Sequence, residues 1–155
     1  MAILKEKDKA PLFNGINQEG NVINIKDFIG KKIILYFYPK DNTPGCTAQA
    51  CNLRDNYNKL IDKGFIVIGI SNDSDKSHKN FATKHNLPFH LIADIDKNIV
   101  NLYGVYGQKK FMGKEYMGIN RTTFIISEKG IIEHIINKVD TKNHTQQIIE
   151  ILNLK

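Results

Sequence analysis

Two apolar, β-branched runs separated by a helical stretch constrain the fold of this chain more than any other feature. Residues 33–38 read Ile-Ile-Leu-Tyr-Phe-Tyr and residues 65–70 read Phe-Ile-Val-Ile-Gly-Ile. Runs of this kind are typical of strands buried on both faces in the middle of a sheet. Between residues 46 and 63, apolar residues recur at steps of three and four, which predicts a helix closed by Gly64. The three segments together predict a strand–helix–strand unit.

The remaining patterns alternate strands with helices. Strands are expected at residues 22–25, 89–93, 124–127 and 131–137, and helices at 76–85, 97–103 and 141–154. The last two strands flank a tight turn and form a hairpin. Residues 104–120 are rich in glycine and lack periodicity, so we expect a loop there. This order predicts an α/β domain with a central mixed β-sheet in a three-layer α/β/α, thioredoxin-like arrangement. Neither a repeat nor a linker is found, so residues 1–155 are expected to form a single domain.

Composition excludes several classes of protein. The chain has 41% hydrophobic and 25% charged residues, which is ordinary for a globular protein. Its formal charge is +6, but the lysines are scattered, and this does not favour nucleic acid as a ligand. No segment resembles a signal peptide, and no apolar run approaches the length of about 18 residues that a membrane helix needs. We therefore expect a cytoplasmic protein without membrane contact. The short segment after the last helix favours a monomer.

The only two cysteines, Cys46 and Cys51, lie together in the stretch PKDNTPGCTAQAC. Cys46 falls in the first turn of the predicted helix, just beyond the carboxyl end of the 33–38 strand, where open α/β sheets place their sites. The helix N-terminus favours the thiolate form, which is the nucleophilic form of a cysteine. The Thr43 hydroxyl, three residues before the sulfur, adds a hydrogen-bond donor. The stretch is therefore a candidate thiol active site, although free cysteines are also commonly plain buried side chains.

The spacing of the two cysteines predicts two conformations. In an intact helix, Cα atoms five residues apart are separated by about 8.7 Å. A disulfide needs them within about 7 Å, so a bond between Cys46 and Cys51 requires the helix to unwind. The spacing suits a dithiol with the helix folded and a disulfide with the helix start melted. The alternative is that Cys51 is incidental.

Metal binding and dithiol exchange are disfavoured. Structural zinc sites usually combine two cysteines two to four residues apart with further close ligands. The chain has no HxxxH pair among His78, His85, His90, His134 and His144, and none of them is near the cysteines in sequence. His78 and His85 are expected to be solvated on a helix surface. The CxxC motif of disulfide oxidoreductases is absent.

The segment from Pro39 to Cys46 resembles the PxxxTxxC signature of peroxiredoxins. The longer stretch YFYPKDNTPGCTAQACNLRD is similar to the PrxQ, or bacterioferritin comigratory protein, group. Further similarity lies at Ala10-Pro11, Phe13 and Gly20, at VIGIS in residues 67–71, at KFMGKEYMGINR in residues 110–121, and in the terminal helix. Residues 11–16 depart from the group's usual pattern, with little expected consequence for catalysis.

The resemblance implies a thioredoxin-like fold and reduction of hydroperoxides without a metal, haem or other cofactor. It implies that Cys46 is the peroxidatic cysteine and becomes a sulfenic acid, while Thr43 orients the peroxide and thiolate. Pro39 would shield the sulfenic acid, and Arg121 would favour the thiolate and stabilise charge on the breaking O–O bond. Cys51 matches the resolving cysteine, which forms an intrachain disulfide. Thioredoxin, glutaredoxin or another thiol reductant would be the partner.

Two alternatives differ from a thiol peroxidase. One is a redox sensor or regulatory protein that uses the same disulfide as a signal. The other is a thioredoxin-like domain whose cysteines are inert. Rapid turnover with a recycling reductant separates the peroxidase from both.

Overall fold

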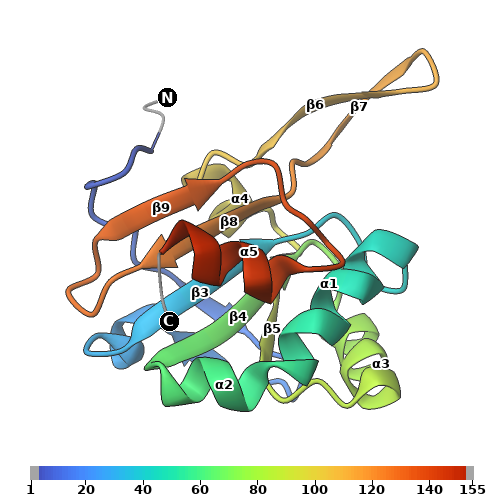
Figure 1. The fold of residues 1–155 in the computed structure, drawn as a ribbon. Coiled ribbons are helices and arrows are strands. Elements are labelled where there is room, and N and C mark those ends of the chain that lie inside the picture. Colours follow the sequence, from blue (N-terminus) through green and yellow to red (C-terminus); the bar gives the residue numbers. More distant parts are fainter. Residues whose placement is uncertain (1–3, 153–155) are drawn as a thin grey trace.

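A seven-stranded mixed sheet organises the protein, whose computed structural model describes residues 4–152 without the side chain of Phe111 (Figure 1). The strand order is β2-β1-β5-β4-β3-β8-β9. The three parallel strands of the centre are β3 (Lys32–Phe37), β4 (Phe65–Ser71) and β5 (His90–Ala93). Antiparallel strands flank them: β1 (Asn14–Ile16), β2 (Val22–Asn24), β8 (Thr122–Ile126) and β9 (Ile132–Ile136). The predicted strand–helix–strand unit is confirmed by the parallel pairing of β3 with β4.

Both faces of the sheet are covered, which explains the continuous apolar runs. One face packs against α1 (Pro44–Asp55), α2 (Tyr57–Asp62), α3 (Asp75–His85) and α5 (His144–Ile151), and the other against η1 (Ile25–Phe28) and α4 (Asn98–Leu102) (Figure 1). Along β3, Ile34 and Tyr36 pack in the core between the sheet and helices α1, α2, α3 and α5. Leu35 and Phe37 pack in the core on the opposite face, against η1 and α4. The predicted three-layer α/β/α, thioredoxin-like class is confirmed.

The helix predicted from residue 46 to 63 is interrupted, and this part of the prediction is wrong. Asn56 separates α1 from α2 with a backbone at φ −108° and ψ 12°, and its side-chain amide donates to the Asn52 carbonyl at 2.8 Å. Asparagine side chains compete with the helical hydrogen-bond pattern in this way. The predicted end at Gly64 holds, because that residue follows α2 with φ +89°.

The segment of residues 104–120 is a β-hairpin and not the expected loop. Strands β6 (Tyr106–Phe111) and β7 (Lys114–Ile119) pair with each other and project beyond the main sheet (Figure 1). Met112 and Gly113 both have positive φ, as a two-residue hairpin turn requires. The hairpin is largely exposed, so its sequence carries no alternation of buried and exposed residues. Strand β1, which the sequence reading did not include, is likewise short and partly exposed.

The expectation that His78 is solvated is also wrong, since this side chain is 0% exposed. His85, at the end of α3, is half-buried. The terminal helix α5 begins at His144, later than predicted, and the predicted helical residues 153 and 154 lie outside the described part of the chain.

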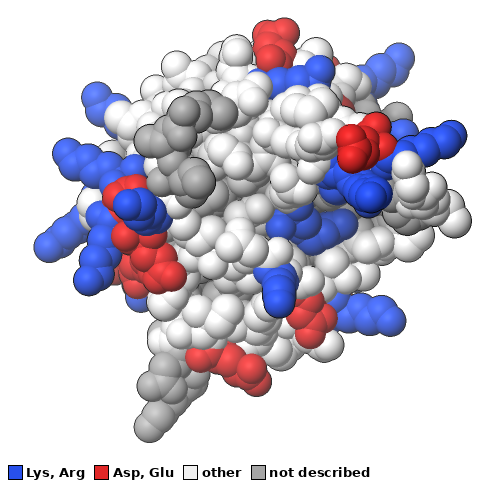
Figure 2. Space-filling view, turned by 90° about the horizontal axis from the view of Figure 1, so that it is seen from above, with Lys and Arg blue, Asp and Glu red and all other residues white. Residues whose placement is uncertain are grey.

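Two surface properties expected from the sequence are the scatter of the basic side chains and the lack of a membrane helix. On the face shown in Figure 2, Lys and Arg side chains lie in separate groups, some near the outline and some in the middle of the face, with acidic side chains beside several of them. Within residues 4–152, no helix has the length and apolar character needed to cross a membrane.

Candidate active site

The loop between β3 and α1 carries the first part of the candidate site. Pro39 follows β3 and is half-buried, and Thr43 is the N-cap residue of α1. The Thr43 hydroxyl donates to the carbonyl oxygen of Lys40 at 2.8 Å, so its proton points back into the loop. This side chain makes no capping hydrogen bond to the amides of α1. The first turn of α1 therefore keeps amide donors that no side chain of the cap occupies.

Cys46 lies in that first turn, with Pro44 at the start of the helix. Its side chain is 1% exposed and its sulfur is free. The N-terminus of a helix carries partial positive charge on its free amides, so a negative charge is stabilised there. Burial without any partner would disfavour a thiolate, so the nature of the sulfur's neighbours is decisive.

Arg121 supplies the partner. One guanidinium nitrogen, Nη2, donates to the Cys46 sulfur at 3.2 Å. The sheet explains how residues so far apart in sequence meet. Phe37, at the end of β3, pairs with Thr122, at the start of β8, so Arg121 stands beside the loop that leads to Cys46. A hydrogen bond from a charged donor to a thiolate is among the stronger ones.

Gln49 holds the other side of this guanidinium and was missed by the sequence reading. Its Oε1 accepts a hydrogen bond from Arg121 Nη1 at 2.7 Å, and its side chain is fully buried. Its Nε2 has no hydrogen-bond partner within the described residues. Its position three residues after Cys46, on the same side of α1, was the available signal.

Close packing limits which residues can stand around the guanidinium. A Cβ atom at Gly45 would lie 3.3 Å from Arg121 Nη2, which is a tight contact. Lys109, from the β6–β7 hairpin, donates to the Ile119 carbonyl at 2.9 Å. Partial burial, reinforced by the charge of Arg121, lowers the pKa of Lys109. Arg121 and Lys109 are therefore two cations on the side of the site that faces the β6–β7 hairpin.

Tyr36 is buried on β3 in the same core as Cys46, and its hydroxyl has no hydrogen-bond partner within the described residues. Burial, with the charge of Cys46 as the second cause, raises the pKa of Tyr36 well above its usual value. The phenol therefore stays neutral and cannot serve as a base. Its ring lies against Gly69 of β4, where an added Cβ would come within 2.7 Å of Cζ.

Cys51 lies later on the same helix. It is half-buried, free, and 3.8 Å from Nδ1 of His85 at the end of α3. Helix α1 continues through both cysteines to Asp55, so the structure presents the folded, dithiol arrangement. The structure thus brings Cys46 and Arg121 into contact, places Thr43 and Pro39 on the adjoining loop, and leaves Cys51 on the helix toward α3.

Comparisons with known proteins identify the family of this chain. The AhpC/TSA family matches residues 7–135. The chain is 47% identical to a putative peroxiredoxin bcp of Coxiella burnetii over 141 residues, which cover 91% of this chain and 93% of the relative. It is 44% identical to peroxiredoxin Bcp of Escherichia coli K12 over 146 residues, with 94% of each chain covered.

The fold agrees with solved structures. A structure of the Xanthomonas campestris bacterioferritin comigratory protein, described for its alkyl peroxide reduction activity, is 29% identical and superposes with a TM-score of 0.85. The match covers 94% of this chain and 98% of that one. The family match spans most of the chain, and both relatives are more than 40% identical to it. The chain therefore belongs to the AhpC/TSA family, in the Bcp/PrxQ group of peroxiredoxins.

Proposed function

We propose that this peroxiredoxin reduces hydrogen peroxide and organic hydroperoxides by a cycle in which Cys46 attacks the peroxide and Cys51 resolves the product. The observation that carries the proposal is the 3.2 Å hydrogen bond from Arg121 to the Cys46 sulfur. A thiol beside a guanidinium and a helix N-terminus has the electropositive surroundings that are typical of a reactive cysteine.

The first step oxidises the sulfur by two electrons. The Cys46 thiolate attacks one oxygen of the peroxide, the O–O bond breaks, and the departing oxygen takes a proton and leaves as water or an alcohol. The product is a Cys46 sulfenic acid. Negative charge moves from the sulfur to the departing oxygen during this step. Arg121, which Gln49 holds at 2.7 Å, is placed to stabilise that charge.

Thr43 and Pro39 have supporting roles in the proposal. The Thr43 hydroxyl, which donates to the Lys40 carbonyl at 2.8 Å, can accept a hydrogen bond from the proton of a bound peroxide through its free lone pairs. That arrangement directs the attacked oxygen toward the sulfur. Pro39 is half-buried at the exit of β3 and limits the access of water to the sulfenic acid.

The second step needs a change of helix structure. Cys51 attacks the Cys46 sulfenic sulfur, the S–O bond breaks, water leaves, and an intrachain disulfide forms. The cysteines lie on one continuous helix, where their Cα atoms are separated by about 8.7 Å, so the start of α1 must unwind. The beginning of α1 is suited to this, because the Thr43 side chain does not cap it and Gly45 is its second residue.

Asn52 sets the end of the segment that unwinds. Its Oδ1 accepts from the Thr145 amide at 2.8 Å, and its Nδ2 donates to the Lys142 carbonyl at 3.0 Å. These bonds tie α1 to the N-terminus of α5 directly after Cys51. Residues 44–51 can therefore rearrange while Asn52 stays attached. A dithiol reductant such as thioredoxin then reduces the exposed disulfide.

Three proteins test the cycle: the wild type, Cys46→Ser and Cys51→Ser, each assayed for peroxide consumption with thioredoxin, thioredoxin reductase and NADPH. Cys46→Ser is expected to be inactive. Cys51→Ser is expected to react once with peroxide and then to be recycled poorly. Wild-type turnover by Cys46→Ser would remove the proposed nucleophile. Unchanged turnover by Cys51→Ser would remove Cys51 from the cycle, and a slow wild type would favour a sensor.

A further inference from the structure

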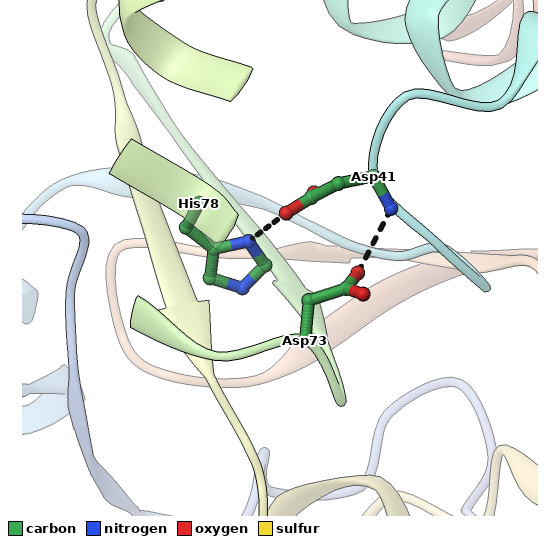
Figure 3. A group of neighbouring side chains, drawn as sticks. All are labelled: Asp41, Asp73 and His78. Atoms are coloured by element: carbon green, nitrogen blue, oxygen red, sulfur yellow. Dashed lines mark hydrogen bonds and ion pairs between the residues drawn. The ribbon is translucent and has the colours of Figure 1, made fainter. Parts of the chain in front are cut away.

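A buried polar group lies directly behind the loop that carries Pro39 and Thr43. It consists of Asp41 from that loop, Asp73 from the segment after β4, and His78 from α3 (Figure 3). Asp41 is 5% exposed and His78 is 0% exposed. Nδ1 of His78 lies 2.7 Å from Oδ2 of Asp41. Charged side chains of this kind are rarely buried unless they are paired.

Hydrogen bonds hold both side chains of the pair in place. Nε2 of His78 faces the carbonyl oxygen of Ile92 at 2.9 Å, and a carbonyl only accepts, so Nε2 carries a hydrogen. The 2.7 Å contact between Nδ1 and Asp41 Oδ2 needs a second hydrogen. The carboxylate also receives the hydroxyls of Ser77 at 2.8 Å and Tyr38 at 2.6 Å. Tyr38, Ser77 and His78 therefore surround the Asp41 carboxyl with hydrogen bonds and hold it in place.

A bound metal ion does not explain this group. Asp41, Asp73 and His78 have ligand atoms within 4.8 Å of one another, as a metal site would require. However, Nδ1 and Nε2 of His78 both hydrogen bond to protein oxygens. Asp73 Oδ2 accepts from the Asp41 amide at 2.8 Å and from the Ser71 hydroxyl at 2.6 Å. The donor atoms are already used to join chain segments.

The group fastens the active-site loop at its middle. Asp41 is held through its side chain by α3 and through its amide by Asp73, and it stands midway between Pro39 and Thr43. The next residue, Asn42, has φ +62°, a conformation that needs support from its surroundings. From Asp41 the chain leads back to β3 in one direction and on to α1, which carries Cys46, in the other.

We propose that Asp41 and His78 are a positioning pair, which fixes Pro39 and Thr43 so that a peroxide meets the Cys46 sulfur in line. This inference rests on the proposed function, because it assigns the pair to the first step of that cycle. Neither residue touches the reacting atoms. The pair acts through the loop, and it leaves residues 44–51 free to unwind during the second step.

The test compares two reactions of Cys46 in the Cys51→Ser background, where only one thiol remains. Oxidation by hydrogen peroxide depends on how the loop orients the substrate. Alkylation by iodoacetamide depends on the thiolate and its exposure but not on an in-line peroxide. Asp41→Ala is expected to slow oxidation by roughly 10- to 100-fold, the range that misplacement by about 1 Å produces. Alkylation is expected to change by less than about threefold, because Arg121 and the helix N-terminus remain.

Asp41→Asn serves as the conservative variant. Its amide can donate to a neutral His78 at Nδ1 and still accept from Tyr38, so the loop stays fastened. Oxidation is expected to recover to within a few-fold of the parent. If Asp41→Ala does not fold, Ser77→Ala replaces it, because this change removes only one hydroxyl donor to Asp41. Its rate of oxidation is expected to fall several-fold. The exposed Asp75 of the same helix provides a control, Asp75→Ala, expected to match the parent.

Several outcomes would overturn the inference. The inference is wrong if a folded Asp41→Ala protein is oxidised at the parental rate. It is also wrong if Asp41→Ala lowers the rates of oxidation and alkylation equally. For the Ser77→Ala fallback, an unchanged oxidation rate counts in the same way. A parent with Cys51→Ser that reacts with peroxide no faster than free cysteine would instead contradict the proposed function itself.

Discussion

Replacement of Arg121 by glutamine tests the electrostatic part of the mechanism. The change removes the donor 3.2 Å from the Cys46 sulfur and also the partner of Gln49 Oε1. A hydrogen bond to a charged group contributes about 1.5–3 kcal/mol. If that contribution is lost from the transition state, oxidation slows by roughly 10- to 150-fold. Arg121→Lys keeps a charge but loses the planar fork that reaches both partners, so it is expected to fall between the wild type and Arg121→Gln.

The assay is the rate of Cys46 oxidation after mixing with hydrogen peroxide, quenched with a maleimide and read by intact mass. The only other arginine, Arg54, is the matched control. It lies near the end of α1, where it pairs with Asp55 and donates to the His85 carbonyl. Arg54→Gln is expected to oxidise within about twofold of the wild type, since surface ion pairs contribute little. Equal rates for Arg121→Gln and the wild type, or equal losses in both variants, would refute the reasoning.

Three further variants or conditions test separate parts of the structure. Gly69→Ala places a Cβ within 2.7 Å of the Tyr36 ring, and we expect a loss of about 1–3 kcal/mol in unfolding free energy by chemical denaturation; an unchanged midpoint would show that the ring moves freely. Gly45→Ala brings a Cβ to 3.3 Å from Arg121 Nη2, so oxidation should slow several-fold with stability nearly unchanged, and an unaltered rate would contradict the tight fit. Burial lowers the pKa of His144 from 6.5 to about 4, so the unfolded chain takes up a proton first as the pH falls. The contribution of His144 to the free energy of unfolding is intact above about pH 6.5 and decreases by about 3 kcal/mol toward pH 4. Denaturation curves at pH 7.5 and 4.5 measure this loss, which His144→Gln should abolish.

The centre of the fold could be predicted because its strands are buried on both faces. The runs at residues 33–38 and 65–70 contain almost only apolar residues, and the structure places them as β3 and β4. The position of the site followed from them, since the loop after β3 leads directly to Cys46. The contact between Arg121 and Cys46 depends on the pairing of β3 with β8, a long-range register that no local pattern displays. Only the resemblance to a family pointed to Arg121 beforehand.

The parts that were missed are those in which local pattern and tertiary environment disagree. The β6–β7 hairpin is exposed, so its strands carry no periodicity, and its turn uses Met112-Gly113 in place of a common turn pair. His78 looks like a surface residue on a polar helix, yet the carboxylate of Asp41 makes its burial possible. Gln49 is an ordinary helix residue until the guanidinium of Arg121 is placed beside it.

The most direct test of the central claim is intact mass and free-thiol titration after mixing the dithiol protein with one equivalent of hydrogen peroxide. The chain contains no tryptophan, so mass is a better reporter of this step than indole fluorescence. The proposed cycle predicts rapid loss of both thiols, with two hydrogens lost and no oxygen gained. Oxygen gained on Cys46 while Cys51 stays free would contradict the resolving role. A reaction no faster than that of free cysteine would contradict the role of Cys46 as the peroxidatic residue.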